Sequence, residues 1–576
     1  SRFAEEFPEV GYYITPGEAL DDDVAAYWVN KVLMPAIYSS GQHPPVWLRE
    51  WEIPYEVGQA ITDEYPELWI ERKYNVEMIA GRHSDPGNAK WAALTGKHIV
   101  NIHMAANLEP FRWSVPSYIQ DCLSDAVENG ANGLHLYPRK SWRWPLTSDL
   151  NSDELQWSRD WMWFEAWARY AWNPNRNEEV ERAYWLQRLT QRFGTRTSAE
   201  KLLDSMETGA DVLPAIQRLV WLGRDNHTVV TAGIKLRQLE HSSGIPFLEL
   251  EDCERIPVWM EAIRSGQKSS GRSPLDFMGE VVLNAEDALQ KASLARELAL
   301  NPASKELALW ESDAKAVRLT AKFYLEKFQA LEAHALWENS SGVERELAGE
   351  RFLAHLQASV ETFRELTELT SLHYESLSDV SAWYPERLQK VPYHWTDILP
   401  ILENELEVYR RDLSQTSEAL SEKPAFPGWV GLWYGDPDLK SLKGKEYLNS
   451  VQVDWPLPNQ DRGSMWSSEY EGYIEPDVSG NIEFAIEADR PVVIRSGDEV
   501  LIDTSRSPGK TRFAIDFKEV SKVPIYLFYN QPKGKTAQLH ILWKMGGSPD
   551  WHPVPSNWLK HSEMQRYWAD RSILVR

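Results

Sequence analysis

GLHLYPRKSWRWPLTSDLNSDELQWSRDWMWFEAWARYAWNP, residues 133–174, is the stretch from which the fold of this chain is predicted. A short apolar run comes first, after the turn-forming pair Asn129-Gly130. A loop rich in Trp and Arg follows, and then a long amphipathic segment with helical spacing. A strand, a functional loop and a helix in this order are typical of one βα unit of a barrel, in which the loops after the strands carry the chemistry.

The loop of this stretch places Arg143 between the planar side chains of Trp142 and Trp144. Indole rings stack on the apolar C–H faces of sugars, and guanidinium groups donate hydrogen bonds to sugar hydroxyls. We therefore expect Trp142 and Trp144 to bind carbohydrate, together with Tyr137 and Arg139 at the end of the strand. Because Trp also fills contacts between domains, a Trp-rich domain junction is the alternative interpretation. The 28 Trp and 23 Tyr of the chain favour carbohydrate.

The composition limits the classes of function. The formal net charge of −25 disfavours nucleic acid and anionic membranes as partners. No apolar run in the sequence is long enough to span a bilayer. The only cysteines, Cys122 and Cys253, do not define a disulfide framework. With 576 residues the chain is too long for one core, so several domains are expected.

Residues 1–175 alternate short apolar runs with helical segments. The predicted strands and helices of this part are strands at 10–14, 46–51, 68–74, 99–104 and 133–137 and helices at 25–38, 56–64 and 117–128. This alternation predicts a parallel sheet with crossover helices, as in part of a (β/α)8 barrel. About five strands cannot close a barrel of eight. A missing N-terminal portion or a second chain is therefore expected to supply the others, because a half-barrel would expose its edge strands.

Three regions follow this C-terminal part of a barrel. Residues 176–423 are predicted to form an all-α domain, because segments such as 305–339 carry apolar residues at three- and four-residue spacing. Residues 424–546 read as short strands separated by turns, which predicts a β-sandwich. Residues 547–576 hold three Trp among prolines and are expected to be a tail that packs on the other domains.

Several motifs of the predicted β-sandwich carry a family resemblance: Gly431-Leu432, WSSEYEGYIEPDVSG at 466–480, EVLID at 499–503 and LHILW at 539–543. With these motifs the region resembles the protective-antigen-type module of bacterial carbohydrate-active proteins. In that family a pair of aspartates often holds calcium and a sugar. Here the corresponding place reads Glu487-Ala-Asp489-Arg490, without the pair, so the resemblance implies a structural role.

The helix predicted at 161–174 ends in Ala-Arg-Tyr-Ala-Trp-Asn-Pro and follows strands in a particular order and spacing. With these features the first third of the chain resembles the second half of the catalytic barrel of α-glucuronidases, glycoside hydrolases that remove glucuronic acid from xylan. The resemblance implies an exo-acting, inverting α-glycosidase without a cofactor. Its expected substrate is a plant or algal polysaccharide or its oligosaccharides, and a secreted or periplasmic bacterial protein is expected.

Position by position, the resemblance implies roles for residues at the strand ends. Glu18 matches the general acid, which must protonate the departing glycosidic oxygen. Trp47 and Arg49 match a pair whose guanidinium holds the sugar carboxylate, and Lys73 matches a second cation for the same group. Glu77 lies near the first base position of the family.

The chain departs from the family at two places. Ile14 stands where the family has another cationic ligand, and the segment from His103 to Asn107 stands where it has its second base carboxylate. The nearest substitute for that base is Glu109, and His103 and Asn107 are expected to contact substrate. A glycosidase for a neutral or sulfated sugar is therefore one alternative. A catalytically inactive glycan-binding or scaffold protein is the other.

The alternation of side chains along a strand sorts the expected site residues by face. Arg49 shares a face with Trp47, and Lys73 shares a face with Glu71. Glu71 is therefore expected inside the barrel, either at the substrate or paired with one of the two cations.

Two residue types leave further alternatives open. Glu18 would also stabilise the start of a helix, because carboxylates favour helix N-termini. His103 and His135 are the residue type that holds zinc, but no third ligand stands at suitable spacing, so no metal is expected.

Overall fold

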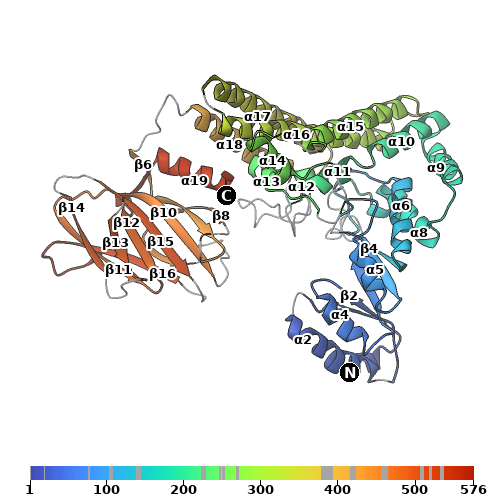
Figure 1. Cartoon of the computed structure of the whole chain (residues 1–576), viewed down its shortest axis with the longest axis horizontal. Helices are drawn as coiled ribbons and strands as arrows, with labels where there is room; N and C mark the ends of the chain where they lie inside the picture. The colour runs from blue at the N-terminus through green and yellow to red at the C-terminus, as the bar shows by residue number, and fades with distance from the viewer. Residues whose placement is uncertain are drawn as a thin grey trace. The chain divides into compact units, whose positions relative to one another are not determined.

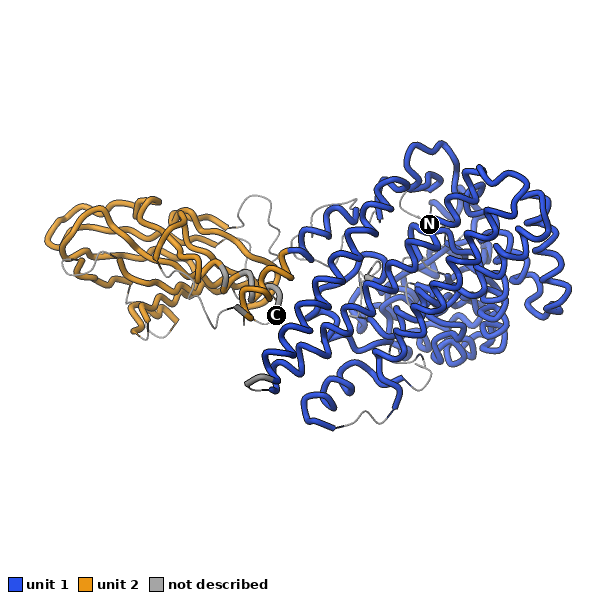
Figure 2. The backbone as a smooth tube through the Cα atoms, turned by 90° about the horizontal axis from the view of Figure 1, so that it is seen from above, with its two compact units in different colours: residues 1–383, 387–403 blue, residues 384–386, 404–576 orange. Residues whose placement is uncertain are grey.

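The computed structural model describes most of the chain. The described residues are 2–17, 20–39, 41–75, 78–102, 108–137, 144–221, 229–245, 248, 253–267, 271–340, 342–377, 394–414, 423–437, 439, 442–455, 465–497, 499–505, 511–517, 522–531 and 537–575. The chain divides into two compact units (Figure 2). The first comprises residues 1–383 and 387–403, and the second residues 384–386 and 404–576.

The first unit begins with a parallel sheet in which the described strands follow the order β1-β2-β3-β4-β5. The strands are β1 (Tyr12–Ile14), β2 (Val46–Arg49), β3 (Trp69–Lys73), β4 (His98–Ile102) and β5 (Ala131–Leu136). Strands adjacent in sequence are adjacent in space, as successive βα units require. The predicted parallel sheet is confirmed.

Helices cover one face of this sheet (Figure 1). They include α2 (Asp22–Trp28), the π-helix η1 (Val29–Leu33), α3 (Met34–Tyr38), α4 (Tyr55–Thr62) and α5 (Gly87–Ala92). Alternate strand residues such as Val46, Leu48 and Ile70 point to this face and pack with Ile61 and Trp91. Burial of each such aliphatic side chain contributes roughly 1.5–3 kcal/mol, so this face anchors the sheet.

The rest of the first unit is helical (Figure 1). Its main helices are α6 (Pro116–Glu128), α8 (Trp161–Trp172), α9 (Glu178–Phe193), α10 (Arg196–Gly209), α11 (Val212–Leu219), α14 (Ile256–Arg264), α15 (Pro274–Glu297), α16 (Lys305–Asn339), α17 (Gly342–Ser371) and α18 (Trp395–Ser414). α16 packs against both α15 and α17, and α10 packs against α15. The predicted helical region is thus confirmed.

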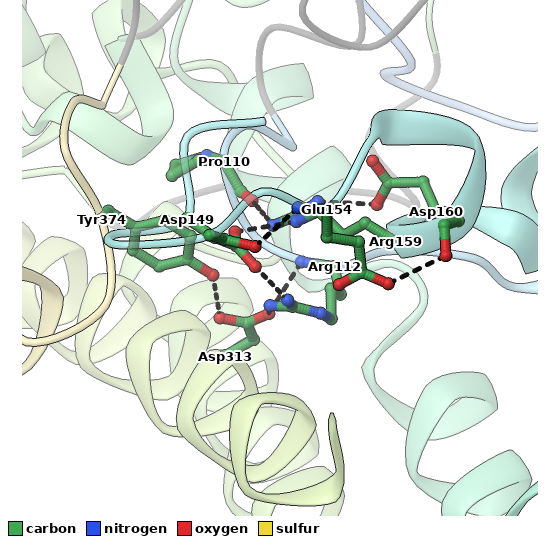
Figure 3. A network of polar contacts seen from close by, with 10 residues as sticks. Pro110, Arg112, Asp149, Glu154, Arg159, Asp160, Asp313 and Tyr374 are labelled. Atoms are coloured by element: carbon green, nitrogen blue, oxygen red, sulfur yellow. Dashed lines mark hydrogen bonds and ion pairs between the residues drawn. The ribbon is translucent and has the colours of Figure 1, made fainter. Parts of the chain in front are cut away.

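A buried network of charges ties the loop after β4 to the helices (Figure 3). Arg112, in that loop, donates from its backbone nitrogen and Nη1 to Asp313 Oδ2 on α16, at 2.9 and 3.1 Å. Its Nη2 pairs with Asp149, which also accepts from Arg159 Nε at 2.8 Å. The hydroxyl of Tyr374 donates to Asp313. The four charged side chains of this network, those of Arg112, Asp149, Arg159 and Asp313, are almost fully buried.

The network lowers the pKa of Asp149. Burial by itself raises the pKa of Asp149, but the guanidinium groups of Arg159 and Arg112 outweigh burial and hold the pKa below its ordinary value. Asp149 therefore stays ionised between the two cations. A complete buried ion pair of this kind changes the free energy of unfolding little, whereas removing one of its partners is strongly destabilising.

The second unit is an antiparallel β-sandwich. Its described strands form one sheet ordered β13-β12-β15-β10-β18-β6, with β7 and β8 joined to β10, and a second ordered β14-β11-β16-β17, with β9 joined to β16. The strands are β6 (Pro424–Pro427), β7 (Trp429–Tyr434), β8 (Leu442–Leu448), β9 (Gln452–Trp455), β10 (Trp466–Ile474), β11 (Asn481–Ala488), β12 (Val492–Ser496), β13 (Glu499–Asp503), β14 (Arg512–Asp516), β15 (Val523–Gln531), β16 (Ala537–Met545), β17 (His552–Pro553) and β18 (Leu559–Ser562). The predicted β domain is confirmed.

Alternating strand residues of both sheets form the core of the second unit. Phe484 and Ile541 from one sheet and Tyr470 and Leu527 from the other are among its fully buried members. The final residues, expected to pack on the other domains, form β17, β18 and helix α19 (Glu563–Val575) within this unit. Ala569 of α19 packs on β7.

Candidate active site

The second face of the parallel sheet carries polar and aromatic side chains. We call it the polar face and define it by Tyr13, Trp47, Arg49, Glu71, Lys73, Asn101, His135 and Tyr137. These residues alternate along the strands with the apolar residues of the covered face, as the two-residue period of a strand requires. Lys73, Asn101 and His135 lie in one row, because they pair across β3, β4 and β5.

The sheet is strongly curved, with the polar face on the inside. The ring of His135 on β5 lies 5.9 Å from the ring of Tyr13 on β1 and 5.8 Å from that of Trp47 on β2. In a flat sheet, strands four positions apart would be separated by about 19 Å. Side chains of this size meet only if the strands curl around them. The polar face therefore lines the inside of an arc.

Glu71 lies at the centre of the polar face and is completely buried. Tyr13 donates its hydroxyl hydrogen to Oε1 at 2.6 Å, and Nδ1 of His135 lies 2.6 Å from Oε2. Because an ionised carboxylate only accepts, the hydrogen of this second bond belongs to Nδ1. Burial first, and then Glu71, raise the pKa of Tyr13, so its hydroxyl remains a donor.

Two cations lie over the indole ring of Trp51, just after β2. Lys73 Nζ is 3.0 Å from the centroid of the Trp51 ring, and the guanidinium carbon of Arg49 is 5.7 Å from it. Arg49 Nη1 also approaches the hydroxyl of Tyr137 at 3.4 Å. Within the described residues Arg49 has no carboxylate partner. Its charge is thus available to an anionic group on the inside of the arc.

The loop after β1 depends on a glycine. A Cβ at Gly17 would lie 1.9 Å from the backbone oxygen of Trp51, so only glycine lets this loop approach the end of β2. The next residue is Glu18, which lies outside the described residues. Five other expected site residues also lie outside them, namely Glu77, His103, Asn107, Arg139 and Trp142.

The structure separates the remaining expected residues into groups. Trp47, Arg49, Glu71, Lys73 and Tyr137 come together on the polar face. The expected pairing of Glu71 with Arg49 or Lys73 is not found, since its carboxylate takes both its hydrogen bonds from Tyr13 and His135 instead.

Two expected residues stand elsewhere in the first unit. Glu109 is buried and lines a cavity of about 10 Å³ with Thr147, Arg159 and Asp160, beside the charge network. Trp144 is 46% exposed, and its ring lies 5.5 Å from that of Trp157, just before α8.

Three residues of the polar face were not predicted as site residues: Tyr13, Asn101 and His135. Strand alternation could have placed each of them on the inner face. Their convergence depends on the curvature of the sheet, for which the sequence carries no signal.

Among the described residues, no group of three or more His, Cys, Asp and Glu side chains is arranged to hold a metal ion. In the same part of the chain, no helix combines the length and apolar character needed to cross a membrane.

Comparison with known proteins adds two findings. The sequence profile of the PA14 domain matches residues 428–545, which lie within the β-sandwich unit. A solved GH138 enzyme targeting the pectin rhamnogalacturonan II is 24% identical, with a TM-score of 0.65 over 72% of this chain. The alignment covers 63% of that enzyme, so the chain spans less than two thirds of its length. This likeness shows a shared fold.

Shorter likenesses were also found. The PA14 domain of the MpAFP antifreeze protein is 14% identical over 25% of this chain and 96% of its own, with a TM-score of 0.21. An epithelial adhesin A domain from Candida glabrata, solved with Galb1-3GlcNAc, gives 14% identity, 25% and 94% coverage and a TM-score of 0.21. No curated protein sequence matches the chain.

Proposed function

We propose that this chain is part of a glycoside hydrolase, an exo-acting and inverting α-glycosidase on a plant or algal polysaccharide or its oligosaccharides. The observation that carries the proposal is the pair of cations, Arg49 and Lys73, that flank Trp51 on the inside of a curved parallel sheet. An indole stacks on a sugar ring, and two cations beside it fit a sugar that bears a carboxylate. The fold shared with the pectin-targeting GH138 enzyme supports the same class of activity.

We further propose that the sheet belongs to a (β/α)8 barrel. The contact between Tyr13 on β1 and His135 on β5 supports this, because strands four positions apart face each other across a barrel of eight. The helix that follows β1 exposes apolar Val24, Tyr27 and Trp28 to solvent. Further strands and helices, from a preceding part of the polypeptide or from a second chain, would cover these side chains and close the barrel.

The chemistry follows from the strand ends. Glu18, which follows Gly17 in the sequence, would protonate the departing oxygen. Glu77, which follows β3 in the sequence, would activate water on the opposite side of the sugar, since Glu109 lies beside the charge network. Inversion requires the acid and the base to stand roughly 6.5–9.5 Å apart, which leaves room for that water. No cofactor takes part.

For the β-sandwich unit we propose a structural role. Asp489, in the place where related modules carry paired aspartates, accepts from the hydroxyl of Tyr529 at 2.8 Å and from the backbone of Gln538 at 2.7 Å. These two hydrogen bonds connect Asp489 to β15 and β16. A secreted or periplasmic location would bring such an enzyme to its polysaccharide.

The proposal is tested with the full chain and 4-nitrophenyl glycosides. We expect turnover of the α-D-glucuronide or the α-D-galacturonide, little turnover of the neutral α-D-glucoside, and release of the β-anomer, followed by proton NMR. Arg49→Gln should lower kcat/KM for the uronide about 100-fold and leave any rate on the neutral sugar unchanged.

Other outcomes would select the alternatives. If neutral or sulfated glycosides are turned over faster than the uronides, the substrate carries that sugar and not a uronic acid. A chain that binds oligosaccharides from pectin or glucuronoxylan without hydrolysing any of them would be a glycan-binding or scaffold protein.

A further inference from the structure

One buried amide of the polar face has no hydrogen-bond partner among the residues that the structure describes. Asn101 is 1% exposed, and within the described part of the protein neither its side-chain oxygen nor its nitrogen is bonded. Native proteins rarely bury a polar group in this way, because it loses its bonds to water and gains none. Asn88, buried on the other side of the sheet, shows the usual situation. Its amide nitrogen donates to two backbone oxygens, and its oxygen meets His98.

The strand register aims Asn101 at the inside of the arc. Its Cα pairs with Lys73 on β3 and with His135 on β5. Residues paired in this way send their side chains to the same face, about 5 Å apart. The unpaired amide therefore stands between an ammonium group and an imidazole on the polar face.

Glu71 orients the imidazole. It holds Nδ1 of His135 through Oε2, and the His135 side chain remains 32% exposed. With the hydrogen on Nδ1, the neutral ring presents Nε2 as an acceptor, and no described residue bonds to that atom. Glu71 itself is completely buried, with Oε1 engaged by Tyr13, so it acts through its neighbours.

We infer that Asn101 and His135 contact the substrate of the proposed glycosidase, and that Glu71 is the positioning residue for His135. The amide of Asn101 donates to one hydroxyl of the sugar ring and accepts from the next, and Nε2 of His135 accepts from a further hydroxyl. Arg49 and Lys73 hold the carboxylate of the same sugar. This inference rests on the proposed function and assigns residues that bind the ring rather than its charge.

The first experiment separates substrate contact from structural support. In Asn101→Leu, kcat/KM of the full chain for the 4-nitrophenyl uronide should fall about 10- to 100-fold, because two hydrogen bonds to substrate are lost. Its thermal midpoint should stay equal or rise, because an unsatisfied amide is replaced by an apolar side chain of similar size. Asn88→Leu is the matched control and should lower the midpoint. An Asn101→Leu protein with wild-type kcat/KM, or with a midpoint lowered as in Asn88→Leu, would overturn the inference.

The second experiment is a double-variant cycle on the same substrate. Glu71→Gln and His135→Phe should each raise KM more than they lower kcat, and the double variant should be no worse than His135→Phe alone. His83→Phe, which removes a surface imidazole paired with Asp125, should change neither constant. Losses that multiply in the double variant would show that Glu71 acts independently of His135.

The outcomes also distinguish the inference from the function on which it rests. If the wild-type chain turns over a uronide and the Asn101, His135 and Glu71 variants have the same kinetic constants, the inference alone is contradicted. A wild-type chain inert toward both uronides and toward rhamnogalacturonan II contradicts the proposed function and the inference with it.

Discussion

Asp313→Ala tests whether the buried charge network holds the loop after β4 to the helices. The carboxylate of Asp313 has a side-chain exposure of 2% and accepts from the backbone and side chain of Arg112 and from Tyr374. Its removal leaves Arg112, itself 3% exposed, with Asp149 as its one remaining carboxylate partner among the described residues, and Arg112 shares that partner with Arg159. Removing one member of a buried ion pair costs about 3–5 kcal/mol.

A cavity beside the network adds to this cost. The side chains of Asp313, Arg112 and Trp113 line a space of about 60 Å³, and truncation to Ala would enlarge it. Because a cavity destabilises in proportion to its volume, the upper part of the range is expected. The free energy of unfolding of the first unit should therefore fall by about 4 kcal/mol.

Urea unfolding of the full chain measures this change. The two units are expected to unfold in separate transitions, so tryptophan fluorescence should be combined with hydrogen exchange of residues in α16. Asp287→Ala is the matched control, because Asp287 forms a half-exposed ion pair with Lys291 on the adjacent helix α15. It should change stability by less than about 1 kcal/mol. A loss below about 1 kcal/mol for Asp313→Ala would refute the role given to the network.

Three further predictions concern other parts of the chain. Acid should destabilise the first unit, because the pKa of Asp149 is lower in the folded state than its ordinary value. The stability that ionised Asp149 contributes is present above the ordinary pKa of Asp and is lost as the pH falls through the folded pKa. The free energy of unfolding, measured at pH 6 and pH 3, should be smaller at pH 3. Gly17→Ala should lower activity about tenfold or more without unfolding the sheet, because the displaced loop carries Glu18; unchanged kcat/KM would contradict this. Glu18→Gln should nearly abolish hydrolysis of the natural glycan, by about 100- to 10,000-fold, and spare much of the rate on an aryl glycoside, whereas equal losses on both would place the acid elsewhere.

The succession of elements could be predicted from the sequence because local signals define it. The helix expected at 305–339 is found as α16 over Lys305–Asn339, since Ser304 caps its start and Ser340-Ser341-Gly342 interrupts the pattern at its end. The strands were predicted within a few residues, because short apolar runs between helical segments are a strong signal.

The candidate site could be predicted only in part. Alternation placed Glu71 inside the sheet, but its partners, Tyr13 and His135, come from strands two positions away on either side. Such contacts depend on curvature, which arises from packing of the whole unit. Asn101 gave no signal at all, because the absence of a partner is a property of the folded surroundings.

The place of β18 in the larger sheet of the second unit has a consequence for synthesis of the protein. β18 lies between β10 and β6, and Ser562 near the end of the chain pairs with Pro424 at the start of the unit. β6 can therefore find its neighbour only after the chain has been synthesised past residue 562. Until then Tyr473 and Ile474 of β10, which pair with β18, are open to pairing with another nascent chain, whereas β7 covers residues 467–471 of the same edge. Premature termination before residue 559 would make that exposure permanent and favour aggregation over folding.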